Sequence, residues 1–169
     1  MPSNLPEQTY WDTQRQHKAA WMKFIDSRTG PALAVTVSWN ERRSVDRCTA
    51  DLGTFVGMAD QRVLGSRFNR YPPEKRLEAL FVFEGVGTTN IHAHSIWWPP
   101  RDRWFRFLKL FPRRRSGLWD WVVPKGSYDV KLLNAVGSNE EFTGYILKGQ
   151  GKNSEADRMV WASQFHPTR

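Results

Sequence analysis

The chain of 169 residues contains 40% hydrophobic and 25% charged residues, which is the usage of an ordinary globular domain and excludes a disordered chain. Cys48 is the single cysteine, so an internal disulfide and a cysteine-based zinc cluster are excluded. No apolar run approaches the length that spans a bilayer, and the polar N-terminal sequence is unlike a signal peptide. We therefore expect one domain, residues 1–169, that is cytoplasmic and makes no contact with a membrane.

Basic residues outnumber acidic residues and gather in one segment. The 25 Lys and Arg residues against 17 Asp and Glu residues give a formal net charge of +8, which suits a polyanionic partner. Seven of the basic residues fall in residues 101–115, RDRWFRFLKLFPRRR. Four apolar residues of this segment repeat at helical spacing and are expected to pack on the core: Trp104, Phe107, Leu108 and Phe111. The run of Arg113, Arg114 and Arg115 is either a solvated loop or a phosphate clamp, and the sequence favours neither.

Hydrophobic periodicity predicts helices and strands mixed along the whole chain. In chain order we expect a helix after Thr13, a strand at residues 32–40, a helix at 44–63, strands at 77–84 and 91–98, a helix within 101–111, a strand at 128–133 and a final helix at 138–149. No internal repeat, linker or low-complexity tract divides the chain. The fold class that we expect is α+β, with an antiparallel sheet and flanking helices.

The strand at residues 32–40 has two different faces, because side chains alternate across a strand. One face is large and apolar and the other is small or polar, with Leu33, Val35, Val37 and Trp39 on the first and Ala32, Ala34, Thr36, Ser38 and Asn40 on the second. A surface of small side chains lets a large ligand lie against it. We expect the face of Ala34, Thr36 and Ser38 to be open for this reason.

Two histidines and a glutamate stand out in ALFVFEGVGTTNIHAHSIWWPP, residues 79–100. His92 and His94 are two residues apart in a strand, so they point to the same face, which we expect to be exposed. If the two strands form a hairpin centred on Thr88, Glu84 lies opposite His92 with Cβ atoms roughly 5 Å apart. Two imidazoles and a carboxylate can bind a divalent cation and leave its other side open for substrate.

Two other interpretations of these three residues remain open. The histidines could be hydrogen-bonded sheet residues, with Glu84 a solvated strand end. The same donor set also serves non-haem Fe(II) oxygenases. The three residues alone therefore do not identify which reaction the site would catalyse.

A tyrosine and a lysine share one face of the predicted final helix. Tyr145 and Lys148 are three residues apart, the spacing at which helical side chains are neighbours. A tyrosine and a lysine beside a metal are what phosphodiester transfer to a phenol requires: a nucleophile, and a positive group besides the cation. For this pair alone, a tyrosine packed at an interface with a snorkelling lysine is the favoured interpretation.

Taken together, these segments resemble the HUH endonucleases, and specifically the single-tyrosine replication initiators (Rep proteins) of rolling-circle replicons. AVTVSWN at residues 34–40 looks like their first motif, and IHAHSI at residues 91–96 is similar to their second, with Glu84 at the place of the third metal ligand. YILK at residues 145–148 looks like their third motif, Y-x-x-K, and SYDVKLL at residues 127–133 resembles the strand before the tyrosine helix. The motifs occur in the family's order and span most of the chain.

The resemblance implies a sheet of about five antiparallel strands that carries a metal and DNA. Glu84, His92 and His94 would hold Mg²⁺ or Mn²⁺, and Tyr145 would attack single-stranded DNA at a replication origin to form a 5′-phosphotyrosine link. Lys148 would position the phosphate or the metal-bound water. The candidate DNA contacts are Thr36, Ser38, Asn40, Arg113, Arg114 and Arg115.

The expected partners are single-stranded DNA, with an adjacent hairpin at a replication origin, and a host helicase and polymerase. We expect the protein itself to come from a bacterium, a plasmid or a phage. The chain itself contains no helicase domain that we can identify, because GQGK at residues 149–152 lacks the spacing and the Ser or Thr of a phosphate-binding loop. Two alternatives remain. A single-tyrosine HUH transposase would share the metal site, and a non-catalytic module could bind nucleic acid through Trp97, Trp98 and the arginine run.

Overall fold

One antiparallel sheet organises the part of the chain that the structure describes, which is residues 19–20, 23, 31–72, 75–112, 116–133 and 159–166 of a computed structural model. The strands are β1 (Ala32–Ser38), β2 (Glu78–Glu84), β3 (His92–Trp98), β4 (Ser127–Leu133) and β5 (Met159–Trp161). The helices are α2 (Val45–Leu64), α3 (Trp104–Leu108) and α4 (Leu118–Val122), with the short 3-10 helices η1 (Phe68–Arg70), η3 (Arg101–Arg103) and η5 (Ala162–Phe165).

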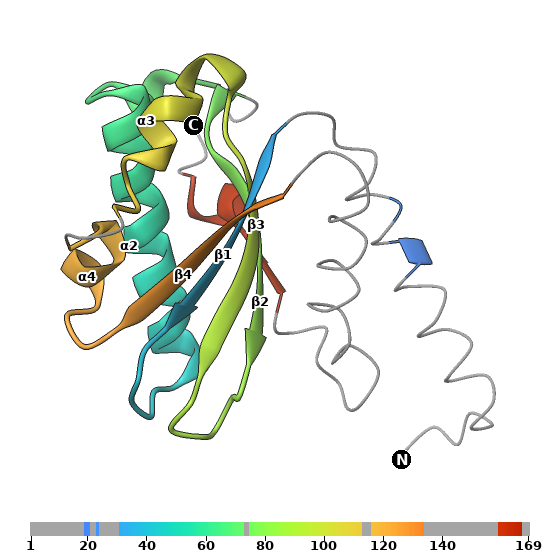
Figure 1. Cartoon of the computed structure of the whole chain (residues 1–169), viewed down its shortest axis with the longest axis vertical. Coiled ribbons are helices and arrows are strands. Elements are labelled where there is room, and N and C mark those ends of the chain that lie inside the picture. The colour runs from blue at the N-terminus through green and yellow to red at the C-terminus, as the bar shows by residue number, and fades with distance from the viewer. Residues whose placement is uncertain are drawn as a thin grey trace.

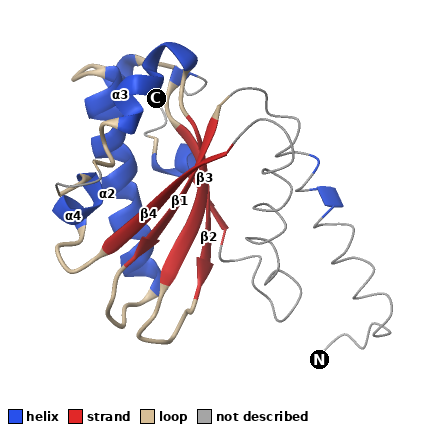
Figure 2. Cartoon of the chain, in the orientation of Figure 1, coloured by secondary structure: helices blue, strands red, loops and turns tan. Residues whose placement is uncertain are grey.

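The five strands lie in the order β4-β1-β3-β2-β5, and every neighbouring pair is antiparallel. The labelled helices α2, α3 and α4 all lie on one side of this sheet (Figure 1, Figure 2). The predicted α+β class with a five-stranded antiparallel sheet is therefore confirmed. Because β1 and β3 are adjacent central strands, residues far apart in the sequence meet in the middle of the sheet.

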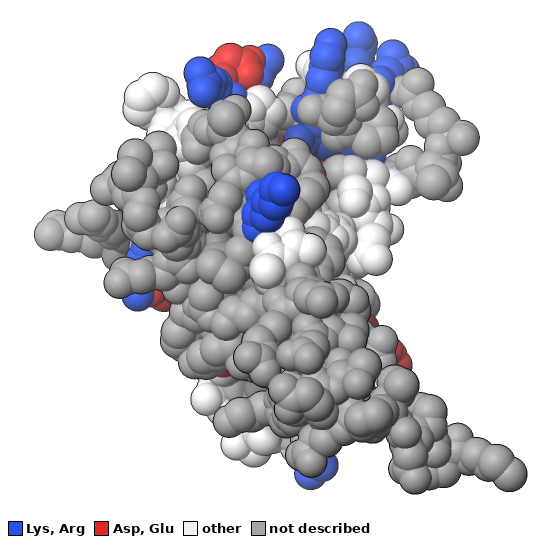
Figure 3. All heavy atoms as spheres, turned by 90° about the vertical axis from the view of Figure 1, so that its right-hand side faces the viewer, with Lys and Arg blue, Asp and Glu red and all other residues white. Residues whose placement is uncertain are grey.

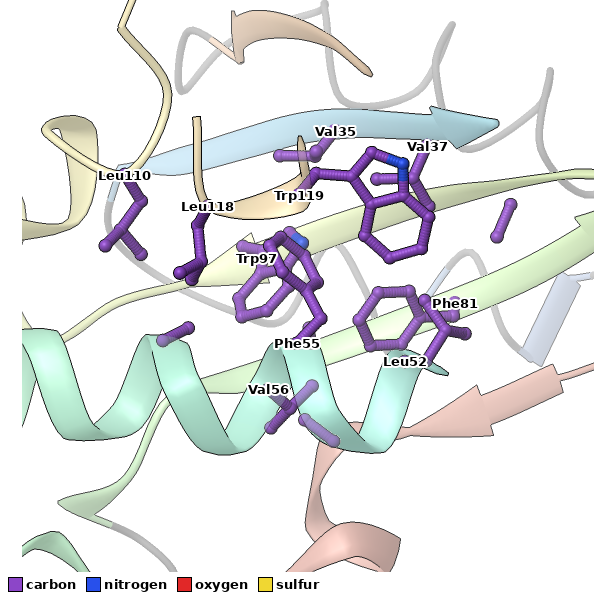
Figure 4. Close-up of a cluster of buried hydrophobic side chains, with 14 of the residues drawn as sticks. Val35, Val37, Leu52, Phe55, Val56, Phe81, Trp97, Leu110, Leu118 and Trp119 are labelled. Atoms are coloured by element: carbon purple, nitrogen blue, oxygen red, sulfur yellow. The ribbon is translucent and has the colours of Figure 1, made fainter. Parts of the chain in front are cut away.

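The main hydrophobic core fills the space between α2 and the sheet. Val35 and Val37 of β1 point toward Phe55 of α2, and Trp97 and Trp119 pack around it (Figure 4). All five side chains are fully or almost fully buried. The large apolar face predicted for the first strand is thus the core face, and burial of such side chains is the main favourable term in folding.

Helix α2 has the ends and the face that its sequence predicts. Ser44 caps its N-terminus by accepting a hydrogen bond from the Arg47 amide at 3.3 Å, and Gly65 ends it with a φ of 98°. Gly53 lies inside the helix, where a Cβ would come within 2.9 Å of the Phe165 ring. The glycine that weakens the helix therefore gives space for η5 to pack on it.

The opposite face of the sheet carries a second apolar cluster at one end. Its buried members come from four strands and are Ala32, Ala34, Leu80, Val82, Ile96 and Leu133. Ala34 is only 3% exposed, so the prediction that Ala34 borders an open surface is wrong. Thr36 and Ser38, further along β1, are partly buried. Any ligand that reaches this face of β1 does so at its Thr36–Ser38 end.

The basic segment forms less helix than the apolar repeat predicts. The chain makes one 3-10 turn and the five residues of α3, after which the Leu110 and Phe111 amides bond to carbonyls three residues back, at 3.0 and 3.2 Å. Pro112 cannot donate the bond that would continue a helix. Phe107 and Phe111 nevertheless pack in the core as expected, while Phe105 is 79% exposed.

Some predicted elements fall outside the described residues. The final helix at 138–149 is one of them, and of the helix after Thr13 the structure describes only Ala19, Ala20 and Lys23, which are helical. Helix α4 and strand β5 were not predicted, because elements of five and three residues are too short to show a period. Among the helices described, none has the length and apolar character needed to cross a membrane.

Candidate metal centre

The turn between β2 and β3 places Glu84 beside the histidines. Glu84 pairs with His92 in the register of the two strands. Gly85 and Gly87 have φ values of 68° and 82°, which side chains rarely adopt. A Cβ on Gly85 would also lie 2.4 Å from the Asn90 carbonyl oxygen. The glycines of the turn therefore fix the register, and the register brings the glutamate to the histidines.

Three ligand atoms converge on one face of the sheet. The His92 Nε2 lies 3.2 Å and the His94 Nε2 lies 3.4 Å from the Glu84 Oε2. One possible ligand atom from each of the three residues lies within 4.8 Å of the other two. The predicted hairpin register and the convergence of these residues are confirmed, and the triad could hold a metal ion.

The three side chains differ in exposure. The side chains of Glu84 and His92 are 24% and 18% exposed, whereas that of His94 is only 7% exposed. The expectation that both histidines face an open surface is therefore wrong for His94. His94 lies between Thr36 of β1 and Val82 of β2 within the sheet. A ligand would approach the triad from the Glu84 and His92 side.

The second nitrogen of each imidazole is also engaged. The His92 Nδ1 lies 2.9 Å from the Asn90 carbonyl oxygen, which only accepts hydrogen bonds, so this nitrogen carries a proton. In neutral His92 the Nε2 then presents a lone pair to the Glu84 carboxylate. Two acceptors facing each other require a cation between them, either a proton on the ring or a metal ion. This arrangement fits the chemistry of a metal ligand held by an outer hydrogen bond.

Thr36 orients the second histidine. Its hydroxyl lies 2.9 Å from the His94 Nδ1, and the pairing of β1 with β3 sets the two residues opposite each other. Metal-binding histidines commonly have such a partner on their other nitrogen. Sequence reasoning assigned Thr36 to DNA contacts and missed this contact. The order of strands in the sheet, which no local pattern reveals, was needed to find it.

Ser38 and Asn40, the other polar residues predicted for this strand, lie near the triad, and both take part in hydrogen bonds to backbone carbonyls. Ser38 is opposite His92, and its carbonyl oxygen accepts from the Trp119 Nε1 at 3.1 Å. Asn40 is exposed, has a φ of 55°, and donates through Nδ2 to the Lys125 carbonyl at 2.9 Å. Asparagine tolerates this left-handed conformation better than most residues. Asn40 thus turns the chain from β1 toward α2.

Several candidate residues fall outside the described residues. They are Tyr145 and Lys148 of the predicted final helix and Arg113, Arg114 and Arg115 of the basic run. Tyr128 lies on the core face of the sheet, opposite Val37, and its hydroxyl donates to the Pro112 carbonyl at 2.9 Å. Burial raises the pKa of Tyr128. A tyrosine on that face cannot reach the three candidate ligands, which lie on the opposite face.

A second carboxylate and histidine pair, which the sequence did not predict, lies on the core side of the sheet. The Asp60 Oδ2 is 3.2 Å from the His166 Nε2, and the two side chains are 0% and 7% exposed. The Asp60 Oδ1 accepts from the Leu77 amide at 3.0 Å. The pair joins α2 to the start of β2 and to the segment after η5, so its position indicates a structural role.

Comparison of the chain with known protein families, with curated proteins and with solved structures found no match. The chemistry of the centre therefore has to be argued from its residues. Its donor set is two imidazoles and one carboxylate on a rigid hairpin, which suits a divalent cation with positions left for a substrate.

Proposed function

We propose that this protein is a metal-dependent endonuclease of the HUH type, which nicks and joins single-stranded DNA at a replication origin. The observation that carries the proposal is the convergence of Glu84, His92 and His94 on one sheet face. The central position of the first two motif segments adds support. Strand β1 contains residues 34–38 of the first motif and pairs directly with β3, which contains the two histidines.

The triad would hold Mg²⁺ or Mn²⁺. A carboxylate suits either cation, and the two imidazoles favour the softer Mn²⁺. A cation bound there would supply a Lewis acid for an oxygen of the scissile phosphate. The chain's own contribution is a fixed set of ligands: the hairpin holds Glu84 against His92, and Thr36 holds the ring of His94.

Tyr145 is the proposed nucleophile. Its phenolic oxygen would attack the scissile phosphorus, lose its proton and form the 5′-phosphotyrosine link, while the bond to the 3′-oxygen breaks. The 3′-oxygen takes up a proton and becomes a free 3′-hydroxyl, from which a polymerase can extend. Attack by a 3′-hydroxyl on the phosphotyrosine reverses these changes and joins strands. Lys148 would position the phosphate during both steps.

The substrate that we propose is a single strand, with an adjacent hairpin at the origin and a host helicase to open the duplex. The positive net charge of +8 supports a polyanionic partner. The triad lies on a face where β1 offers only the short side chains of Thr36 and Ser38, so an unpaired strand could approach it. A duplex would hold its phosphates away from a side chain on a helix.

Covalent capture tests this proposal. The protein is incubated with random single-stranded DNA in Mn²⁺, washed under denaturing conditions, and the DNA that remains attached is sequenced. We expect attachment at a defined sequence, metal dependence, and little reaction with blunt duplex. A preference for hairpins at transposon ends would instead identify a transposase. Binding without attachment in any metal would identify a non-catalytic nucleic-acid-binding module and overturn the proposal.

A further inference from the structure

A cavity of about 370 Å³ lies at the end of the β2–β3 hairpin that is far from the metal centre. It is lined by residues where β2 begins and β3 ends, among them Glu78 and Trp98, which pair in the register. Glu78 is six residues from Glu84 along β2, or roughly 20 Å at the usual rise of a strand. The cavity is therefore separate from the metal centre, and its volume is that of a small-molecule site.

Arg76 lines this cavity and is a buried cation that lacks a counterion in the described part of the chain. The residue is 4% exposed. Its guanidinium donates to two carbonyl oxygens, those of Tyr71 at 3.0 Å and Asn69 at 2.9 Å. The remaining nitrogen, Nη1, is buried and has no hydrogen-bond partner. A buried charge is costly unless it is paired, so an anion that enters this cavity gains a strong partner.

The charges at the mouth of the cavity also favour an anion. Lys75 and Arg103 line it together with Arg76, against Glu78 and Asp102. The Asp102 side chain is 72% exposed, while that of its partner Arg103, at 3.0 Å, is 32% exposed. Most of the Lys and Arg side chains visible in Figure 3 lie toward the upper end of the view, which in Figure 1 is the end of the sheet where α3 lies.

The remaining residues that line the cavity are aromatic or aliphatic. Tyr71, Trp98, Leu64 and Pro100 also line the cavity. Tyr71 packs against the main core and Trp98 against the second cluster, so the two aromatic residues reach the cavity from the two sides of the sheet. A nucleobase stacks on such rings whatever its sequence. Phosphate is the anion that a cluster of arginine and lysine recognises best. Aromatic residues beside a buried arginine thus match a ligand that has a flat base and a phosphate in one unit.

We propose that this cavity binds one nucleoside phosphate, with the base against Trp98 and Tyr71 and the phosphate at Arg76, Lys75 and Arg103. The ligand is either a free mononucleotide or one nucleotide of a bound strand. Binding here requires neither the metal triad nor Tyr145, so the proposal goes beyond the nicking reaction and can hold if that reaction fails.

The test is titration of the full chain with thymidine 5′-monophosphate, inorganic phosphate, thymidine and a labelled oligothymidylate. EDTA is present throughout, so that cleavage and metal binding play no part. We expect the mononucleotide to bind more tightly than phosphate or thymidine alone. The double variant Lys75→Gln with Arg103→Gln should weaken mononucleotide or oligothymidylate binding about tenfold, the effect of losing charge-assisted contacts. The matched control is Arg101→Gln with Lys125→Gln, which removes the same charge from exposed residues outside the cavity.

The two sources of the ligand give different patterns. A mononucleotide that binds alone and displaces the oligothymidylate identifies a site for both. A variant that weakens only the oligothymidylate identifies a site for one nucleotide of a strand. The inference is overturned if the double variant and the control bind both ligands as the parent does, or if phosphate alone binds as tightly as the mononucleotide. Arg76→Met, provided that it folds, should abolish the rise in Tm that the bound ligand causes in the parent.

Discussion

The Glu84 Oε2 lies 3.2 Å from the His92 Nε2 because the register of β2 with β3 sets these two residues opposite each other. The same oxygen lies 3.4 Å from the His94 Nε2, so one carboxylate faces both imidazoles. The ring of His92 donates through Nδ1 to a carbonyl. The three side chains could therefore hold a metal ion where they meet, and the geometry leads to a direct binding experiment.

Glu84→Gln should reduce Mn²⁺ affinity by at least about tenfold, because an amide oxygen replaces a charged ligand. Calorimetric titration of the parent should show one site. Asp129→Asn is the matched control, because it removes an exposed carboxylate from the same face of the sheet. Equal affinity of the Glu84 variant and the parent would exclude the triad as a metal site.

His92→Ala and His94→Ala should both lose Mn²⁺ binding and metal-dependent cleavage, but their stabilities should differ. His94 is buried and contacts Thr36, so its removal should cost about 1–3 kcal/mol of the free energy of unfolding. His92 is closer to the surface, so its replacement by alanine should lower the free energy of unfolding less. Denaturant unfolding measures the difference, and undiminished Mn²⁺ binding in both variants would contradict the assignment.

Thr36→Val should lower the affinity for Mn²⁺ about tenfold while Glu84, His92 and His94 remain in place. The substitution removes the hydroxyl that lies 2.9 Å from the His94 Nδ1, and loss of such an outer contact commonly costs 10-fold to 100-fold, roughly, in metal affinity. Thr36→Ser keeps the hydroxyl and should restore binding. Equal weakening by Val and Ser would indicate a packing effect.

Cys48 should resist alkylation in the folded protein. Its side chain is fully buried, and burial raises the pKa of the thiol from 9.0 to about 12. Because the thiolate is the reactive form, iodoacetamide at pH 8 should react at least about a hundredfold more slowly with native than with unfolded protein. Since the raised pKa favours the neutral thiol in the folded state, stability should fall as the pH rises from 9 toward 12. Rapid alkylation of native protein at pH 8 would contradict this burial.

Neutralising Arg113, Arg114 and Arg115 together decides between a phosphate clamp and a solvated loop. A clamp predicts weaker single-strand binding and a salt dependence that is flatter by about 0.7 in log-log slope per lost contact. The control is neutralisation of three exposed arginines, one before, one on and one after α2: Arg42, Arg62 and Arg67. Fluorescence anisotropy at several salt concentrations measures both sets. A slope equal to that of the parent would assign the run to a solvated loop.

Side-chain alternation and turn chemistry were enough to predict from the sequence that Glu84, His92 and His94 come together. Alternation places His92 and His94 on one face, and the glycine-rich turn sets the register that brings Glu84 to them. Both are local properties of the chain. The large face of β1 was predicted in the same way and forms the core.

The arrangement of strands could not be predicted from local patterns. That β1 lies between β4 and β3 depends on long-range pairing, and from it follows the contact of Thr36 with His94. The same limit applies to Ala34, whose small side chain suggested open space but is covered in the fold. No local sequence pattern predicts that Arg76 is buried beside a cavity.

Formation of a covalent bond between protein and DNA tests the central claim most directly. Labelled single-stranded DNA of the captured sequence is incubated with the protein in Mn²⁺ and run on a denaturing gel. The parent should give a slower band, Tyr145→Phe should give none, and Lys148→Ala should give a weaker one while still binding DNA. Tyr128→Phe, which changes a tyrosine on the core face, should behave as the parent. An adduct that persists in Tyr145→Phe, or that never forms in the parent, would contradict the proposed mechanism.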